Sequence, residues 1–225
     1  MIPIGDENKR GFIPFINYLL VASNIVIYFL FLPESNAAAE TFFKKFGLIP
    51  VHLVNNPSDI KGYLSIFSSM FLHGGLLHLA GNMLYLWIFG DNIEYAIGHF
   101  RYFIFYLLVG IAAAVTQIML DPTSDVPMIG ASGAISGVLG AYLIKYPMNK
   151  VSILFFLIII IRVIKVPALI VLLLWFIFQV WNGYYHMNSG LAGGVAWFAH
   201  IGGFVAGFVL VKFFELSKPK KQPRF

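Results

Sequence analysis

The sequence contains no cysteine and few charged residues. Without cysteine, the chain has no disulfide bond and no thiolate to serve as a nucleophile or a metal ligand. Only 11% of the 225 residues are Asp, Glu, Lys or Arg, whereas a soluble domain averages about 25%. The chain is also 59% hydrophobic. This composition excludes an ordinary soluble domain and is typical of an integral membrane protein.

Six charge-poor segments are each near or above the roughly 20 residues that a helix needs to cross a bilayer. The sequence therefore predicts an all-α polytopic membrane protein in which residues 1–225 form one domain. The predicted membrane helices cover residues 12–32, 66–90, 101–120, 132–146, 166–183 and 192–213, and a basic tail follows over residues 214–225.

The few charges indicate the orientation of the chain. With a cytoplasmic N-terminus, six spans place 12 of the 15 Lys and Arg residues in the cytoplasm and leave Lys44, Lys45 and Lys61 outside. The segment 151–161 is apolar but short and β-branched, so we interpret it as an interfacial or re-entrant connection. A seventh span there would move the basic tail outside. We expect a multi-pass protein of the plasma or inner membrane with both termini in the cytoplasm, and no nucleic-acid partner.

The first apolar run, residues 11–33, is longer than the core of about 7–15 residues in a signal peptide, so we interpret it as an uncleaved anchor. The long connection after it, residues 33–61, contains the apolar stretch FGLIPVHLV. This stretch is too apolar for a solvated linker. It predicts a loop that packs on, or dips into, the outer leaflet.

Several polar side chains lie in segments that should be apolar. They are His73, His78, Asn82, Ser132, Ser136 and His200. Polar residues within a membrane usually face the bundle interior or water and are candidates for function. Counting about 1.5 Å per residue places His78, Ser132 and His200 at one level, roughly 10 Å below the outer surface. We therefore expect these three side chains to meet in one site.

The fourth predicted helix is short. From Ser132 it spans only about 22 Å, which is less than the thickness of a bilayer. Its N-terminus is therefore expected inside the bundle, where irregular backbone must line protein or water. The sequence predicts a water-filled cavity that opens to the outside.

Small residues lie on one face of the fourth and of the sixth predicted helix. They are Gly133, Gly137 and Gly140 on the fourth, and Ala199, Gly203 and Gly207 on the sixth. Close packing at these residues would bring His200 within reach of Ser132. The serine is then a candidate nucleophile and the histidine its base. Gly130 and Gly133 free the backbone on either side of the serine.

Acyl transfer also needs hydrogen-bond donors for the developing oxyanion. The backbone N–H of Ser132 lies at the positive end of its helix. His78 and Asn82 are four residues apart on one helix face, and both side chains donate. No carboxylate lies at that level, so the sequence predicts a Ser–His dyad without an acidic third member.

These residues resemble the motifs of the rhomboid family of intramembrane serine proteases, and the resemblance covers nearly the whole chain. The motifs are G-x-S-G at residues 130–133, two histidines and an asparagine at His73, His78 and Asn82, and an Ala-His pair with small residues at Ala199, His200, Gly203 and Gly207. The chain lacks the Trp-Arg pair that many members carry in the first loop. It has Ser136 where several relatives have an aromatic residue.

The resemblance implies a six-helix rhomboid bundle that needs no cofactor. It implies that Ser132 and His200 cleave transmembrane helices of substrate proteins near their outer end. It further implies that His78, Asn82 and the Ser132 backbone bind the oxyanion, and that His73 supports them. The fifth helix, 166–183, and the loop around residues 184–190 are the expected gate and cap.

Each polar residue alone has an ordinary structural interpretation, as a packing serine or an interhelical hydrogen bond. Three histidines also permit a metal site, but the sequence has no HExxH motif and no carboxylate beside them, so we expect no metal. A catalytically silent rhomboid-like protein that binds membrane helices is a second possible function. A transporter or channel is a third, although the lower halves of the helices are apolar.

Overall fold

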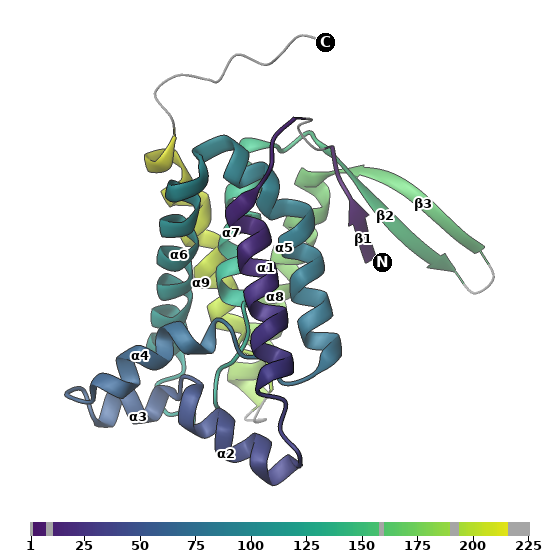
Figure 1. The fold of residues 1–225 in the computed structure, drawn as a ribbon. Coiled ribbons are helices and arrows are strands. Elements are labelled where there is room, and N and C mark those ends of the chain that lie inside the picture. The colour runs from purple at the N-terminus through teal and green to yellow at the C-terminus, as the bar shows by residue number, and fades with distance from the viewer. Residues whose placement is uncertain (1, 8–10, 158–159, 190–193, 216–225) are drawn as a thin grey trace.

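The computed structural model describes residues 2–7, 11–157, 160–189 and 194–215. These residues form a bundle of long helices, with short helices at one end and a small sheet beside the other end (Figure 1). The long helices are α1 (Phe15–Leu30), α5 (Leu76–Ile97), α6 (His99–Leu120), α7 (Ser132–Lys145), α8 (Ala168–Ser189) and α9 (Trp197–Leu210), which the 3-10 helix η1 (Val211–Phe214) continues. The short helices are α2 (Asn36–Phe46), α3 (Pro50–Asn55) and α4 (Ile60–Ser69).

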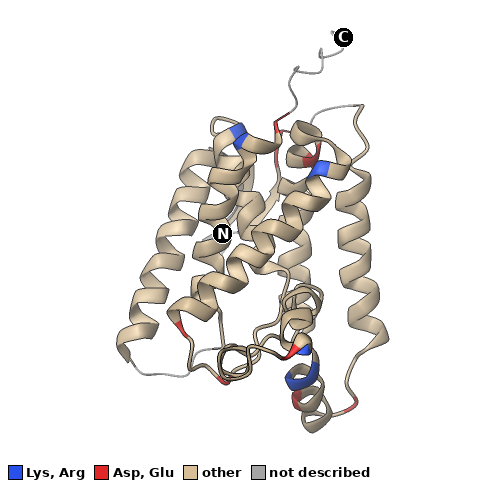
Figure 2. Cartoon of the chain, turned by 90° about the vertical axis from the view of Figure 1, so that its left-hand side faces the viewer, with Lys and Arg blue, Asp and Glu red and all other residues tan. Residues whose placement is uncertain are grey.

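The bundle has the character of a polytopic helical membrane protein. Within the described residues, α6, α8 and α9 with η1 are long and apolar enough to cross a membrane, and α1 is a shorter apolar helix. Figure 2 shows the charged residues gathered at the two ends of the bundle, with uncharged helix between them. A total of six spans stays a prediction.

Helix α7 is the central element of the bundle. It contacts α5, α6, α8 and α9, and ten of its 14 residues are buried. Most of these buried residues are small or aliphatic, and a helix that is apolar all round is stable only when other elements surround it. The enclosure is weaker at the start of α7, where Ser132 and Gly133 are half-buried.

Glycines allow α7 and α9 to pack backbone against backbone. A Cβ atom added at Gly203 would lie 2.1 Å from the carbonyl oxygen of Gly133. A Cβ atom added at Gly207 would lie 1.8 Å from the carbonyl oxygen of Gly137. Both distances are shorter than any real contact, so only glycine fits at these two positions of α9. This approach sets the separation of the two helices.

The predicted second membrane helix, 66–90, is wrong at both ends. Residues 66–69 belong to α4, and α5 begins at Leu76 and continues past Asp91 to Ile97. The charged residues near its end do not stop it, because the side chain of Glu94 is fully buried. Its carboxylate accepts hydrogen bonds from the backbone N–H groups of Ile16, at 2.9 Å, and Asn17, at 2.7 Å. These are free donors in the first turn of α1.

The all-α prediction missed a three-stranded sheet. Strands β1 (Ile2–Gly5), β2 (Lys150–Leu157) and β3 (Ile160–Pro167) pair antiparallel in the order β1-β2-β3. In this register Ile153 of β2 lies opposite Ile164 of β3 and Pro3 of β1. The segment interpreted as an interfacial connection is therefore mainly a β-hairpin, as its β-branched composition favours. Val151 and Ile153 are buried against the bundle.

The loops also differ from the prediction. The first loop, residues 33–61, is largely helical, and Leu48 exchanges two backbone hydrogen bonds with Met128, at 2.7 and 3.1 Å. This bridge holds the loop against the segment that precedes Ser132. Helix α8 continues to Ser189, so most of the predicted cap, residues 184–190, is helix rather than loop. Gly190 and the tail from residue 216 lie outside the described residues.

Candidate active site

The structure brings Ser132 and His200 together across the α7–α9 contact. Ser132 is the first residue of α7, and His200 lies in the first turn of α9. The serine Oγ is 2.8 Å from the histidine Nε2. This is a hydrogen-bond distance, and it is the geometry in which an imidazole takes the proton of a hydroxyl.

The backbone before the serine has a conformation that favours glycine. Gly130 has a φ of +123°, in a region that residues with a Cβ rarely adopt. Its N–H donates to the carbonyl oxygen of Ser69 at 2.8 Å, which ties the segment to the end of α4. Ala131 is fully buried. The backbone just before Ser132 is thus held in place. The N–H of Ser132 has no acceptor within the helix, because it lies in the first turn.

His78 and Asn82 extend from α5 toward the same place. A Cβ atom added at Gly130 would lie 2.8 Å from Nε2 of His78 and 3.5 Å from Nδ2 of Asn82. Both side chains line a cavity of about 320 Å³ together with Ser132 and His200. Two nitrogen donors and a backbone N–H that has no acceptor within its own helix therefore lie around one small space beside the serine.

His73 lies just before α5 and contacts both Asn82 and His78. Its Nε2 is 2.9 Å from Nδ2 of Asn82, and its ring meets that of His78 edge to face, with centroids 5.1 Å apart. An amide nitrogen carries two hydrogens. Asn82 therefore donates one to His73 and keeps the other for the cavity. His73 itself is buried and is not among the residues that line the cavity.

The remaining predicted supporting residues lie in the helix contact or inside α7. The hydroxyl of Ser136 is buried and donates to the carbonyl oxygen of Ser132 at 2.6 Å. Ala199, like Gly203, faces Gly133 across the α7–α9 contact. In place of the family's aromatic neighbour, Trp175 and Trp197 lie beside His200, with ring centroids 6.1 and 6.2 Å away.

Sequence reasoning missed two glutamines. Oε1 of Gln179, on α8, is 2.8 Å from Nδ1 of His200. Oε1 of Gln117, on α6, accepts the N–H of Ala199 at 3.1 Å and so satisfies a free donor at the start of α9. The available signal was that each is a polar residue inside a long apolar run, which is the criterion that singled out the histidines.

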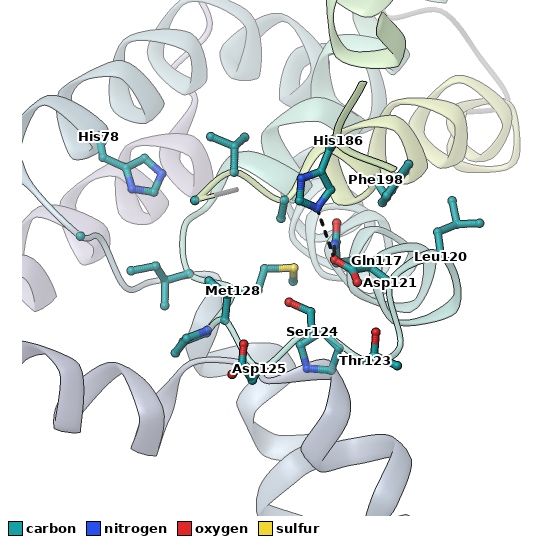
Figure 3. A pocket seen from close by; sticks show the side chains of 18 of the residues that line it. His78, Gln117, Leu120, Asp121, Thr123, Ser124, Asp125, Met128, His186 and Phe198 are labelled. Carbon is teal, nitrogen blue, oxygen red and sulfur yellow. Dashed lines mark hydrogen bonds and ion pairs between the residues drawn. The ribbon is translucent and has the colours of Figure 1, made fainter. Parts of the chain in front are cut away.

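A second, larger cavity adjoins the first. It has a volume of about 960 Å³ and shares His78, Met128 and Ala196 with the inner cavity. Figure 3 shows its polar side, where Asp121, Thr123, Ser124, Asp125 and His186 converge. His186 Nε2 is 3.7 Å from the Asp121 carboxylate.

Among the residues that the structure describes, no group of three or more His, Cys, Asp or Glu side chains is placed to hold an ion. His73 and His78 are in contact, but their neighbour is the amide of Asn82.

Several known proteins are similar to this chain in sequence. Residues 61–215 match the family model of the rhomboid domain. The chain is 32% identical over 199 residues to rhomboid protease GluP of Bacillus subtilis, an alignment that covers 88% of this chain and 35% of that protein. It is 32% identical over 145 residues to RHOMBOID-like protein 5 of Arabidopsis thaliana, covering 64% of this chain and 42% of that one. For the mitochondrial rhomboid protein 1 of Saccharomyces cerevisiae, the identity is 29% over 144 residues, with coverages of 62% and 39%. The chain thus spans 35–42% of the length of these relatives.

Proposed function

The chain belongs to the rhomboid family, and on that premise we propose that it is an intramembrane serine endopeptidase. Its substrates are membrane proteins whose transmembrane helices it cleaves near the outer face. The observation that carries the proposal is the 2.8 Å contact between Ser132 Oγ and His200 Nε2. Two donor side chains, His78 and Asn82, line the same cavity. A relative named as a protease aligns with 88% of the chain.

The proposed membrane arrangement has six spans, formed by α1, α5, α6, α7, α8 and α9. The end with the sheet and both termini faces the cytoplasm of a cell membrane. The end with α2, α3 and α4 lies on the outer leaflet. The distribution of charges at the two ends and the asymmetry of Lys and Arg along the sequence support this arrangement. In it, α7 starts below the outer surface and the larger cavity opens outward.

The first chemical step forms an acyl-enzyme. Ser132 Oγ attacks the carbonyl carbon of the scissile peptide bond while Nε2 of His200 takes the hydroxyl proton. The electron pair of the C=O bond moves onto oxygen. The Ser132 N–H and the side chains of His78 and Asn82 donate to this oxyanion. As the C–N bond breaks, His200 returns its proton to the leaving amine.

The second step releases the product. Water reaches the ester through the outer cavity, and His200 Nε2 takes one of its protons as the oxygen attacks the acyl carbon. The tetrahedral intermediate collapses, the serine regains its proton from His200, and a new carboxyl end leaves. A peptide bond within a helix is shielded and hydrogen-bonded, so the substrate helix must unwind before either step. We propose that it enters laterally beside α5 and α8.

A cleavage assay in liposomes tests the proposal. The substrate is a single-span protein with small residues near its outer end, and the enzyme is compared with Ser132→Ala and His200→Ala. Two matched controls are Ser152→Ala, in β2, and His52→Ala, on an exposed face of α3. Cleavage is expected to disappear in the first two variants and to persist in the controls.

Persistent cleavage in Ser132→Ala would show that the nucleophile lies elsewhere. A catalytically silent relative is the alternative function, and it predicts a different result. Such a protein would retain the substrate helix in a pull-down, leave it intact, and show no labelling of Ser132 by a fluorophosphonate.

A further inference from the structure

Gln179 is a buried amide in the middle of an apolar helix. It lies in the α8 sequence LLLWFIFQVW, and only 4% of its surface is exposed. A buried polar side chain normally has a hydrogen-bond partner, because leaving it unpaired costs about 1–3 kcal/mol. The partner of its Oε1 is Nδ1 of His200, at 2.8 Å. The glutamine therefore contacts the proposed base on the side opposite to Ser132.

We propose that Gln179 is a positioning residue that holds His200 in the tautomer and orientation needed to deprotonate Ser132. The inference rests on the proposed serine-protease function. To accept the serine proton, Nε2 must carry no hydrogen, so the hydrogen of the neutral ring must be on Nδ1. The carbonyl oxygen of Gln179 accepts that hydrogen and favours this tautomer. The other tautomer would place an N–H at Nε2, where it cannot act as a base.

A neutral acceptor suits this position better than a carboxylate. The sequence has no Asp or Glu between residues 126 and 214, which includes all of α7, α8 and α9. An isolated carboxylate inside a membrane bundle is costly because no water solvates it. An amide oxygen fixes the tautomer without adding a buried charge. Gln179 thus takes the orienting role of a third member in a site that has no acid.

The location of Gln179 links the dyad to the packing of α8. Phe176 of α8 stacks on Phe204 of α9, with centroids 4.5 Å apart. Other α8 side chains are exposed, including Leu174, Ile177 and Trp181. A hydrogen bond does not survive a displacement of about 1 Å. If α8 swings outward to admit a substrate helix, His200 loses its orienting partner, so the dyad is aligned only when α8 is packed on α9.

The test uses a fluorophosphonate, which reaches Ser132 through the outer cavity and needs no transmembrane substrate. The variants are Gln179→Met, which keeps the shape and removes the acceptor, and Gln179→Glu, which keeps an acceptor oxygen at the same reach. The control is Asn182→Met, because the Asn182 amide donates to the Phe178 carbonyl oxygen of its own helix, at 2.7 Å, rather than to the dyad. Thermal unfolding of each variant checks that it is folded.

We expect the labelling rate of Gln179→Met to fall by roughly 10- to 100-fold, since a positioned general base contributes about 100-fold or more. In substrate cleavage the loss should be in kcat rather than in KM. Gln179→Glu should recover most of the rate, and Asn182→Met should match wild type. Labelling of Gln179→Met at the wild-type rate would overturn the inference, and so would an equal loss in Gln179→Glu while it remains folded.

A second measurement needs no variant of Gln179. In protein labelled with ¹⁵N-histidine, NMR reports which ring nitrogen of His200 carries the hydrogen, with His200→Ala giving the assignment. Hydrogen on Nδ1 supports the inference, and hydrogen on Nε2 overturns it. If wild type is not labelled by the fluorophosphonate at all, the proposed protease function fails, and the NMR result still tests whether Nδ1 carries the hydrogen that Gln179 is proposed to accept.

Discussion

Helix α9 carries His200 between two neighbours, and the two contacts are built differently. Against α7 the contact is backbone on backbone, as at Gly207, where no side chain fits. Against α8 it consists of side chains, chiefly the Phe176–Phe204 stack and the hydrogen bond from His200 to Gln179. The protein also buries less of α8: 22% of its most apolar 18 residues are buried, against 39% for α9 with η1. The rigid contact therefore sets the distance between serine and histidine, and the looser contact sets the orientation of the ring.

The largest effect should come from breaking the rigid contact. In Gly207→Val, the new Cβ would lie 1.8 Å from the Gly137 carbonyl oxygen, far closer than a carbon and an oxygen can approach, so α7 and α9 must separate. We expect destabilisation by about 3 kcal/mol or more, together with loss of fluorophosphonate labelling and of cleavage. Thermal unfolding and labelling measure both. Gly81→Ala is the control, because a Cβ there has nothing within 4 Å; equal damage in that variant would contradict the comparison.

A covalent link between α8 and α9 should strongly reduce the cleavage of transmembrane substrates but not the labelling of Ser132 by the small probe. A Cβ added at Gly183 of α8 would be 3.5 Å from the Cβ of Trp197 on α9, which suits a disulfide. The chain has no other cysteine. In the double variant Gly183→Cys with Trp197→Cys, oxidation should reduce cleavage of a transmembrane substrate by roughly tenfold or more, if outward motion of α8 precedes chemistry.

Labelling of Ser132 by the small probe should persist in the oxidised double variant, and reduction should restore cleavage. The two single-cysteine variants serve as controls, because oxidation cannot join their helices. Undiminished cleavage in the cross-linked protein would mean that substrates reach Ser132 without motion of α8 relative to α9.

An intermediate effect is expected at Gly130, in the segment that precedes Ser132. In Gly130→Ala, the methyl group would meet Nε2 of His78, and the backbone would be strained at φ +123°. Displacing one oxyanion donor costs about 10²–10³ in kcat, so we expect a loss near the lower end, about 100-fold. The loss should appear in labelling as well as in cleavage. A loss in cleavage alone would show that the alanine hinders the substrate rather than the oxyanion donors.

The smallest effect on activity should come from the sheet end, far from both contacts. Asp6 accepts from Asn92 and Tyr142, and burial raises its pKa to about 6. Because the folded state then holds a proton that the unfolded chain releases near pH 4, stability should fall as the pH rises from about 4 to 6. Asp6→Asn should remove that part of the slope and leave labelling unchanged. A melt series across this pH range measures it, and an unchanged slope would contradict the assignment.

Much of the fold was accessible from the sequence because its signals are local. The long apolar runs predicted a helical membrane protein. The spacing of small residues on α7 and α9 pointed to the contact that joins Ser132 to His200, and their separation of 2.8 Å fits the expected dyad. The errors lie where a residue far away in the sequence contacts the segment and changes its structure. Glu94 does not end α5, because the N–H groups of Ile16 and Asn17, 78 and 77 residues away, donate hydrogen bonds to its buried carboxylate.

The sequence by itself determined the membrane class, the family and the residues able to carry the chemistry, because hydrophobicity, helix period and side-chain type are properties of short segments. Only the tertiary structure decided which residues of different helices and strands contact one another. It paired β2 with β3 and joined the N-terminal strand β1 to β2. It also placed Gln179 against His200, a contact between residues 21 positions apart on two helices. The rotation of α8 about its axis decides that contact, and packing against neighbouring helices sets this rotation.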